Sequence, residues 1–289
     1  MTWFIRLGLA AWVVTALTLT WLPGAPLEAR ARGKGATRRT PRLKLWDRVL
    51  YDRWRRADAL TMKAEKLLAR KKYAQAAELI RQAIKIRPYA PSLWFALGTM
   101  HSLAGRYPQC VKALQRTRQL GPKFRPNLVA FRLGLCLSLS DRIAEGTREY
   151  LKVKPGRWVK ASIRHWNLAD NYMALGRLTE AVSHYQNALR YHPGQRVLHF
   201  ALAVALDRQG RRRAAERRMK RALQLDPTAS ALASKDIIWL PAYDHHYYQA
   251  LRFFVAGRRA TALDHWQRFY QSAPRTPWRF VIQGRVDEM

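Results

Sequence analysis

The sequence is poor in acidic residues and has almost no cysteine. The 289-residue chain contains 53 Lys and Arg against 19 Asp and Glu, which gives a formal net charge of +34. An excess of this size predicts attraction to anionic surfaces, whatever the fold. The two cysteines, Cys110 and Cys136, are too few for a disulfide-rich scaffold or a four-cysteine zinc site. We expect them to be buried thiols, and a disulfide between them would require an oxidising compartment.

The chain also lacks the sequence motifs of common enzymes. It has no Gly-rich phosphate loop, no nucleophile elbow and no HExxH zinc motif. Asp244, His245 and His246 are potential metal ligands, but adjacent residues on a helix point in different directions and no third ligand is evident. We therefore predict a protein without catalytic activity, cofactor or metal site.

The apolar run near the N-terminus is too short for a permanent membrane span. Leu7 to Leu22 carry no charge, and Pro23-Gly24 ends the run. A helix of this length, at about 1.5 Å per residue, falls short of a hydrocarbon core of roughly 30 Å. The length suits a signal peptide, and the small residues at Ala29 and Ala31 predict cleavage after Ala31. We expect residues 1–31 to be a signal peptide and the mature protein to be periplasmic or part of the cell envelope.

The charges that flank this run favour a different topology. Six basic residues between 30 and 42 follow the run, whereas only Arg6 and the amino terminus precede it. Positive charge is retained on the cytoplasmic side, so this bias favours an uncleaved anchor with the following domain in the cytoplasm. No cysteine precedes residue 110, which excludes a lipid-anchored lipoprotein. Export and anchoring are both kept as alternatives.

Residues 32–56 are expected to form a basic linker followed by an amphipathic helix. Residues 30–56 hold 11 basic and two acidic residues, a net charge of +9, and early Gly and Pro residues indicate a flexible tether. From Leu43 the apolar spacing is helical, with Trp46, Leu50 and Trp54 on one stripe. We predict that this helix caps the domain that follows. The alternative is an interfacial helix that inserts Trp and Leu into a bilayer and places Arg on anionic headgroups.

A period of 34 residues organises the rest of the chain. Pro88 and Pro122 are separated by 34 residues, and so are Pro193 and Pro227. Before each proline the sequence predicts an apolar helix, a Gly or Lys turn, and a second helix with small residues at fixed places. No such unit buries its apolar face alone, so the units must stack.

This pattern resembles the tetratricopeptide repeat family, whose helix–turn–helix unit has preferred residue types at eight positions. The unit from Pro91 matches best, with Trp94, Leu97, Gly98, Gly105, Tyr107, Cys110, Leu114 and Pro122. Six units start at residues 57, 91, 127, 162, 196 and 243, and repeat positions below are counted from these starts. The resemblance implies an all-α fold, a right-handed α-solenoid of about six 34-residue repeats over residues 57–276. A 13-residue insertion, Ser230–Ala242, precedes the last unit, and the tail at 277–289 looks too short for the usual capping helix.

The resemblance also implies a binding surface, because the first helices of the family line its concave side. Position 5 carries five aromatic residues in succession after Thr61. We predict a groove for a protein segment with apolar anchors, formed by Phe95, Phe131, Trp166, Asn167, Asp170, Phe200 and Tyr247. The alternative is that these aromatic residues pack between neighbouring helices. Asn167 is the only match to the family's clamp for C-terminal carboxylates, so binding of chaperone tails is not expected.

Positive charge gathers on one turn and second helix. The residues proposed to contact an anionic surface are Arg211, Arg212, Arg213, Arg217, Arg218 and Arg221. They predict either a solvated face or contact with anionic lipid or acidic envelope polymers. Nucleic acid is the alternative partner of another class, which an export signal makes less favoured. The predicted function is a non-catalytic protein–protein interaction scaffold of the cell envelope.

The histidines recur at equivalent repeat positions. His165, His199 and His246 occupy position 4, and His184 and His265 occupy position 23. Recurrence at equivalent sites predicts a packing role.

Overall fold

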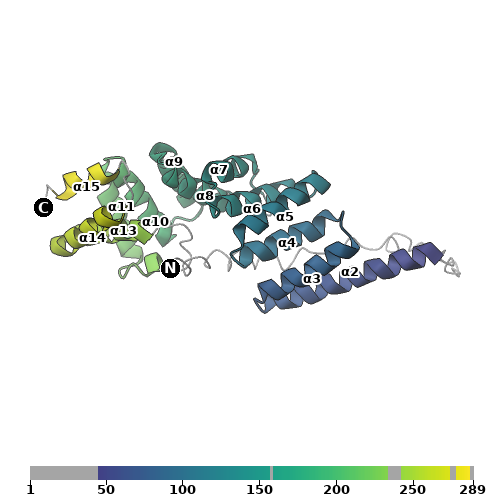
Figure 1. Ribbon diagram of the computed structural model, residues 1–289. Helices are drawn as coiled ribbons and strands as arrows, with labels where there is room; N and C mark the ends of the chain where they lie inside the picture. Colours follow the sequence, from purple (N-terminus) through teal and green to yellow (C-terminus); the bar gives the residue numbers. More distant parts are fainter. Residues whose placement is uncertain (1–44, 157–158, 234–241, 274–277, 287–289) are drawn as a thin grey trace, which may run out of the picture. The chain divides into compact units, whose positions relative to one another are not determined.

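The computed structural model describes residues 45–156, 159–233, 242–273 and 278–286, and every regular element in these ranges is an α-helix (Figure 1). The all-α repeat architecture is therefore confirmed. The predicted signal peptide, residues 32–44 of the linker and most of the insertion lie outside the described residues. The described helices fall into two compact units, one ending at Phe124 and the other beginning at Arg125, and each is described by itself.

The N-terminal unit consists of two antiparallel helix pairs. In the first pair α2 (Leu45–Ala69) packs against α3 (Tyr73–Ile86), and in the second α4 (Pro91–Leu103) packs against α5 (Tyr107–Leu120). Small residues at positions 8, 20 and 27 let the paired helices approach closely. In the first repeat these are Ala64, Ala76 and Ala83, all fully buried.

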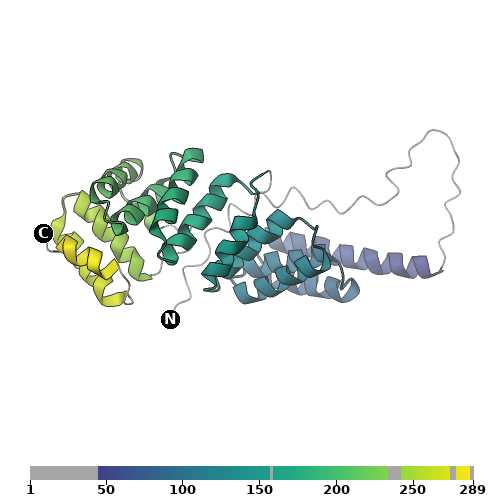
Figure 2. The ribbon, with the colours of Figure 1, turned by 90° about the horizontal axis from the view of Figure 1, so that it is seen from above.

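The C-terminal unit continues the same pairing. Its helices are α6 (Pro126–Ser138), α7 (Ile143–Lys152), α8 (Ala161–Ala174), α9 (Leu178–Tyr191), α10 (Arg196–Arg208), α11 (Arg212–Leu225), α12 (Ser230–Ala233), α13 (Ala242–Val255), α14 (Arg259–Ser272) and α15 (Trp278–Val286). The pairs are α6 with α7, α8 with α9, α10 with α11, and α13 with α14 (Figure 2). Helix α10 lies at the centre of this unit, because every residue from Val197 to Arg208 is buried.

The turn between the two helices has the same backbone conformation in all six repeats. Position 15 has a positive φ each time, at Lys71, Gly105, Asp141, Gly176, Gly210 and Gly257. Glycine adopts this conformation without steric cost, whereas other residues are strained in it. The shared conformation confirms the register of six repeats, including the degenerate repeat that starts at Asn127.

In the degenerate repeat, glycine residues take the place of alanine where the two helices pack closely. Gly134 and Gly146 occupy positions 8 and 20, and a Cβ atom on Gly146 would lie 2.3 Å from Ser138 Oγ and 2.8 Å from the Gly134 carbonyl oxygen. The second helix, α7, ends at Lys152. Position 27, Val153, therefore lies beyond the end of the helix, and the small residue missing from this position is not needed there.

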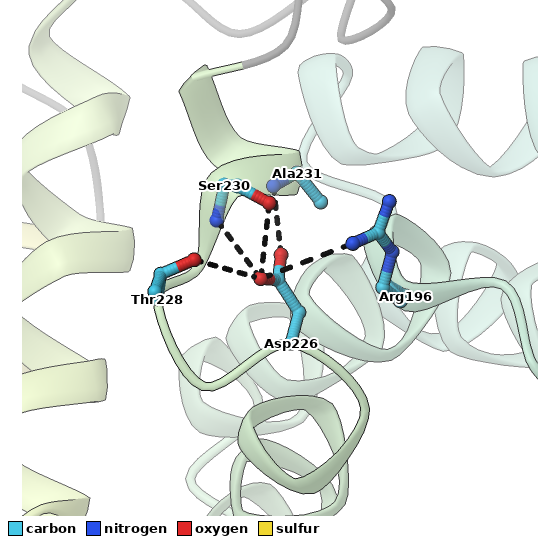
Figure 3. Close-up of polar contacts among 5 residues, drawn as sticks. All are labelled: Arg196, Asp226, Thr228, Ser230 and Ala231. Atoms are coloured by element: carbon cyan, nitrogen blue, oxygen red, sulfur yellow. Dashed lines mark hydrogen bonds and ion pairs between the residues drawn. The ribbon is translucent and has the colours of Figure 1, made fainter.

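The insertion begins with a capped turn. The Asp226 carboxylate accepts hydrogen bonds from the backbone amides of Ser230 (3.0 Å) and Ala231 (2.7 Å) and from the hydroxyls of Thr228 and Ser230 (Figure 3). Arg196 lies 3.9 Å away. Burial acts to raise the pKa of Asp226, but these hydrogen bonds outweigh it and the pKa is lowered. The carboxylate thus fixes the short helix α12 onto the end of α11.

Two expectations about the ends of the array are corrected. The predicted capping helix is not a separate element, because α2 runs unbroken from Leu45 to Ala69 and the side chains of residues 49–56 are exposed. The sequence predicts a C-terminal tail too short for the usual capping helix, but residues 278–286 form the helix α15, which packs against α14 and α10. The side chain of Arg285 holds α15 in place, because it is buried against acidic residues of the C-terminal unit.

Candidate partner-binding surface

Four of the five predicted groove aromatics are buried. Phe95, Phe131, Phe200 and Tyr247 have exposed fractions of 3%, 7%, 0% and 0%. Phe131 meets the ring of Tyr150 edge to face, with centroids 5.5 Å apart. The expected exposed column is therefore corrected: these aromatic residues are enclosed, and the rings of Phe131 and Tyr247 contact aromatic rings on the second helix of their own repeat. Asn167 is buried as well.

Accessible apolar residues remain at the inner positions of α6 and α8. Leu128, Leu135, Ile163 and Trp166 pack on the core of the C-terminal unit but are only partly buried. They occupy positions 2, 5 and 9 of two helices that contact each other. We call this set, together with Asp170, the α6–α8 surface. Of the predicted groove residues, Trp166 and Asp170 belong to it.

Asp170 is an unusual carboxylate for a surface residue. Burial raises its pKa to about 7, although hydrogen bonds from the side chains of Tyr185 and Trp166 act to lower it. The Tyr185 hydroxyl donates to Asp170 Oδ1 over 2.7 Å. The carboxylate is held in place from two helices and changes its charge near neutral pH. It gives the α6–α8 surface one fixed polar contact among apolar side chains.

The inner positions of α10 are closed by a buried ionic network. Asp207 at position 12 accepts a hydrogen bond from the Tyr247 hydroxyl (2.8 Å) and forms an ion pair with Arg285 of α15. Arg285 also contacts Glu216 over 3.1 Å. Each buried charge thus has a partner, as burial requires. The sequence alone did not identify Arg285, which is one of two basic residues, with Arg279, in the apolar tail.

Asp244, which the sequence offered as a potential metal ligand, forms a second ion pair of the network. Arg208 lies 2.5 Å from Asp244, and its guanidinium carbon lies 4.8 Å from the centre of the Tyr247 ring. His246 instead pairs with His265, with their Nδ1 atoms 3.1 Å apart. Within the described residues, no group of three or more His, Cys, Asp and Glu side chains is arranged to hold a metal ion.

The histidine pair also occurs two repeats earlier, in the repeat that starts at residue 162. The Nδ1 atoms of His165 and His184 are 2.7 Å apart, and the His184 ring stacks on Tyr172. Burial, followed by the nearby His165 and Arg164, lowers the pKa of His184 to about 4. Both positions join the two helices of one repeat, which is the packing role that their recurrence predicts.

The basic residues of α11 and its turn separate into exposed and partly buried members. Arg211, Arg213, Arg217 and Arg221 are exposed, while Arg212 and Arg218 are partly buried. Arg218 Nη1 lies 3.3 Å from His199 Nδ1. Arg213, Arg217 and Arg221 follow each other at intervals of four and form one exposed basic stripe along α11.

Cys110 and Cys136 are fully buried, and neither is a free thiol, so the expectation of buried thiols is wrong and only their burial is confirmed. No helix among the described residues is long and apolar enough to cross a membrane.

Comparisons with known proteins agree with this architecture. Tetratricopeptide repeat family models match residues 50–123 and 172–235. A curated relative, anaphase-promoting complex subunit 3 of Schizosaccharomyces pombe, is 26% identical over 174 residues, which cover 58% of this chain and 25% of that protein. The chain thus spans about a quarter of the length of this relative.

Solved structures share the fold at low sequence identity. A structure of MamA from Desulfovibrio magneticus RS-1 matches 60% of this chain and 96% of its own, with 15% identity and a TM-score of 0.54. The structure of PilW, a widely conserved type IV pilus biogenesis factor, matches 80% of this chain and 98% of its own, with 14% identity and a TM-score of 0.55. These structures show the same fold, and the family matches in both units together with the curated relative show that the chain is a tetratricopeptide repeat protein.

Proposed function

We propose that this protein is a non-catalytic protein–protein interaction scaffold that binds a segment of a partner protein on the α6–α8 surface. The observation that carries the proposal is the partial exposure of apolar side chains at inner repeat positions of α6 and α8, whereas α10 and α13 bury the apolar residues at the same positions. Accessible apolar residues around a fixed polar group are typical of peptide-recognition sites. Trp166 is the central anchor, because Trp is enriched among the residues that contribute most binding energy.

Asp170 supplies the specificity of the proposed contact. Its carboxylate lies beside Trp166, and Trp166 and Tyr185 both donate hydrogen bonds to it. A partner segment with an apolar side chain and a neighbouring hydrogen-bond donor or basic group fits this arrangement. The proposal therefore selects a segment of mixed apolar and basic character over an acidic one.

The test is a comparison of partner capture by two single variants. Full-length wild type, Trp166→Ala and the control Tyr270→Ala are used as bait, and captured proteins are quantified by mass spectrometry. Tyr270 is exposed and lies on α14, away from the α6–α8 surface. We expect Trp166→Ala to lose one or more partners by about 30-fold, equivalent to about 2 kcal/mol, while Tyr270→Ala retains them. Equal capture by both variants, with unchanged circular dichroism, would refute the assignment of this surface.

We also propose that the scaffold acts in the cell envelope after cleavage at Ala31. The proposal is supported by the short apolar run at Leu7–Leu22 and the small residues before Arg32. Fractionation of cells that express a C-terminally tagged chain, followed by mass spectrometry of its N-terminus, tests it. An exported form that begins near Arg32 is expected. An intact Met1 chain in the membrane fraction, protected from external protease, would establish the anchored topology instead.

A further inference from the structure

Helix α2 packs against α3, but its first three turns extend past the end of α3. Helix α2 has 25 residues and its partner α3 has 14. Arg87, directly after α3, contacts Asp58 over 3.1 Å and lies 5.2 Å from the centre of the Trp54 ring. The end of α3 therefore lies beside residues 54–58, and both ribbon views show α2 continuing past it (Figures 1 and 2).

This projecting segment exposes large apolar side chains. Val49, Leu50, Tyr51 and Trp54 are 44–55% exposed. Leu50 and Trp54 continue the stripe of Ala57, Thr61 and Ala64, which α3 buries completely or nearly so further along the helix. A stripe that is buried in one half of a helix and exposed in the other requires a partner for the exposed half.

Charge decides which partner fits. The projecting segment carries Arg48, Arg53, Arg55 and Arg56 against Asp47 and Asp52, and the chain as a whole carries +34. A second copy of the chain would bring equal positive charge to the same place, which opposes self-association. A nucleic acid supplies negative charge but offers nothing for Val49 and Leu50. An anionic bilayer satisfies both requirements, because its headgroups attract arginine and its interface accepts Trp, Tyr and Leu.

We propose that residues 49–56 of α2 form an interfacial helix that lies on an anionic lipid bilayer. Leu50 and Trp54 insert below the headgroups, and Arg55 and Arg56 contact lipid phosphates. The site is separate from the α6–α8 surface, so its test does not depend on partner binding. It also does not depend on whether residues 1–31 are cleaved, since the contacts involve α2 alone.

The test uses the full-length chain and a local readout, because residues 1–31 could themselves bind vesicles. Trypsin cleavage at Arg48, Arg53, Arg55 and Arg56 is timed with vesicles of phosphatidylcholine, with vesicles that contain 30 mol% phosphatidylglycerol, and without lipid. We expect anionic vesicles to slow cleavage in this segment about tenfold or more, and phosphatidylcholine to have little effect.

Matched variants separate the apolar and the basic contribution. Leu50→Ser with Trp54→Ser removes the protection, whereas the control pair Tyr89→Ser with Tyr191→Ser, exposed elsewhere, retains it. In the charge test, Arg55→Ala with Arg56→Ala should weaken binding of the segment to anionic vesicles roughly 25-fold. This is measured as the rise in lipid concentration needed to protect Arg48 and Arg53 from trypsin. The side chains of Leu50, Trp54, Tyr89 and Tyr191 are all exposed. Both double variants should therefore keep the melting temperature of the wild type, which verifies that they fold.

Three results would overturn the proposal. Equal cleavage with and without anionic vesicles would show that the segment does not bind lipid. Equal protection by an RNA homopolymer without lipid would assign the segment to nucleic acid. Protection that rises with protein concentration in the absence of vesicles would assign it to a second copy of the chain.

Discussion

Replacement of Gly146 by alanine tests the close packing of the degenerate repeat. In the C-terminal unit a Cβ atom at this position would lie 2.3 Å from Ser138 Oγ, 2.8 Å from the Gly134 carbonyl oxygen and 3.0 Å from the Ser138 amide nitrogen. Two of these atoms belong to the backbone of α6, so rotation of a side chain does not remove the overlap. The helices α6 and α7 must separate for the methyl group to fit.

The magnitude follows from two opposing effects. Alanine in place of glycine within a helix stabilises by about 1 kcal/mol. Overpacking of a tight interface costs about 1–3 kcal/mol, and an overlap with backbone belongs at the upper end of that range. The net expectation is a loss of about 2 kcal/mol in the free energy of unfolding, equivalent to a fall of roughly 5 °C in melting temperature for a unit of this size.

The assay is thermal unfolding followed by circular dichroism, with Gly194→Ala as the matched control. A Cβ atom at Gly194 has no neighbour within 4 Å, so this variant should be as stable as the wild type or slightly more so. Ser138→Ala combined with Gly146→Ala removes the closest overlap and should recover part of the loss, because the backbone contacts remain. A Gly146→Ala variant as stable as Gly194→Ala would refute the packing argument.

Three further predictions concern acidic and basic groups. Because the folded pKa of Asp170 is raised above its ordinary value to about 7, its contribution to stability is fully present below the unfolded pKa and is lost as pH rises through about 7. Asp170→Asn should therefore exceed the wild type in melting temperature at pH 8 and converge with it towards pH 4, whereas a constant difference would contradict the shift. Asp226→Ala should cost about 1 kcal/mol locally and speed amide hydrogen exchange in α12, and the wild type should lose this contribution only as pH falls through the lowered folded pKa of Asp226. Arg285→Ala leaves Asp207 buried without its ion-pair partner and should destabilise the C-terminal unit by about 3–5 kcal/mol, measured by urea unfolding; Arg285→Ala with Asp207→Asn should recover part of the loss, and a neutral single variant would show that α15 is not held by this pair.

Local features of the fold were readable from the sequence because they depend on short-range rules. The 34-residue period, the glycine or lysine turns and the small residues at positions 8 and 20 all act within one repeat. The structure confirms them in the six positive-φ turns and in buried residues such as Ala64, Ala76 and Ala181. Even the degenerate repeat was placed in register, because Asp141 adopts the turn conformation that glycine adopts in four other repeats.

The candidate site was only partly predictable, because exposure depends on how repeats pack against one another. Phe200 and Trp166 occupy the same repeat position and have similar character, yet Phe200 is fully buried and Trp166 is partly exposed. The difference arises from helix α10, whose residues 197–208 are all enclosed by neighbouring elements. The sequence around Phe200 and Trp166 does not indicate which of the two side chains is buried.

The sequence by itself determined the repeat, its register and the strong positive charge, since periodicity and composition are properties of the chain alone. The tertiary structure decided which inner positions stay accessible, that Arg285 pairs with Asp207, and that the first turns of α2 project beyond α3. Each of these depends on contacts between residues far apart in the chain or on the relative lengths of packed helices. Such contacts are set by the balance of burial over the whole unit, and no local pattern encodes that balance.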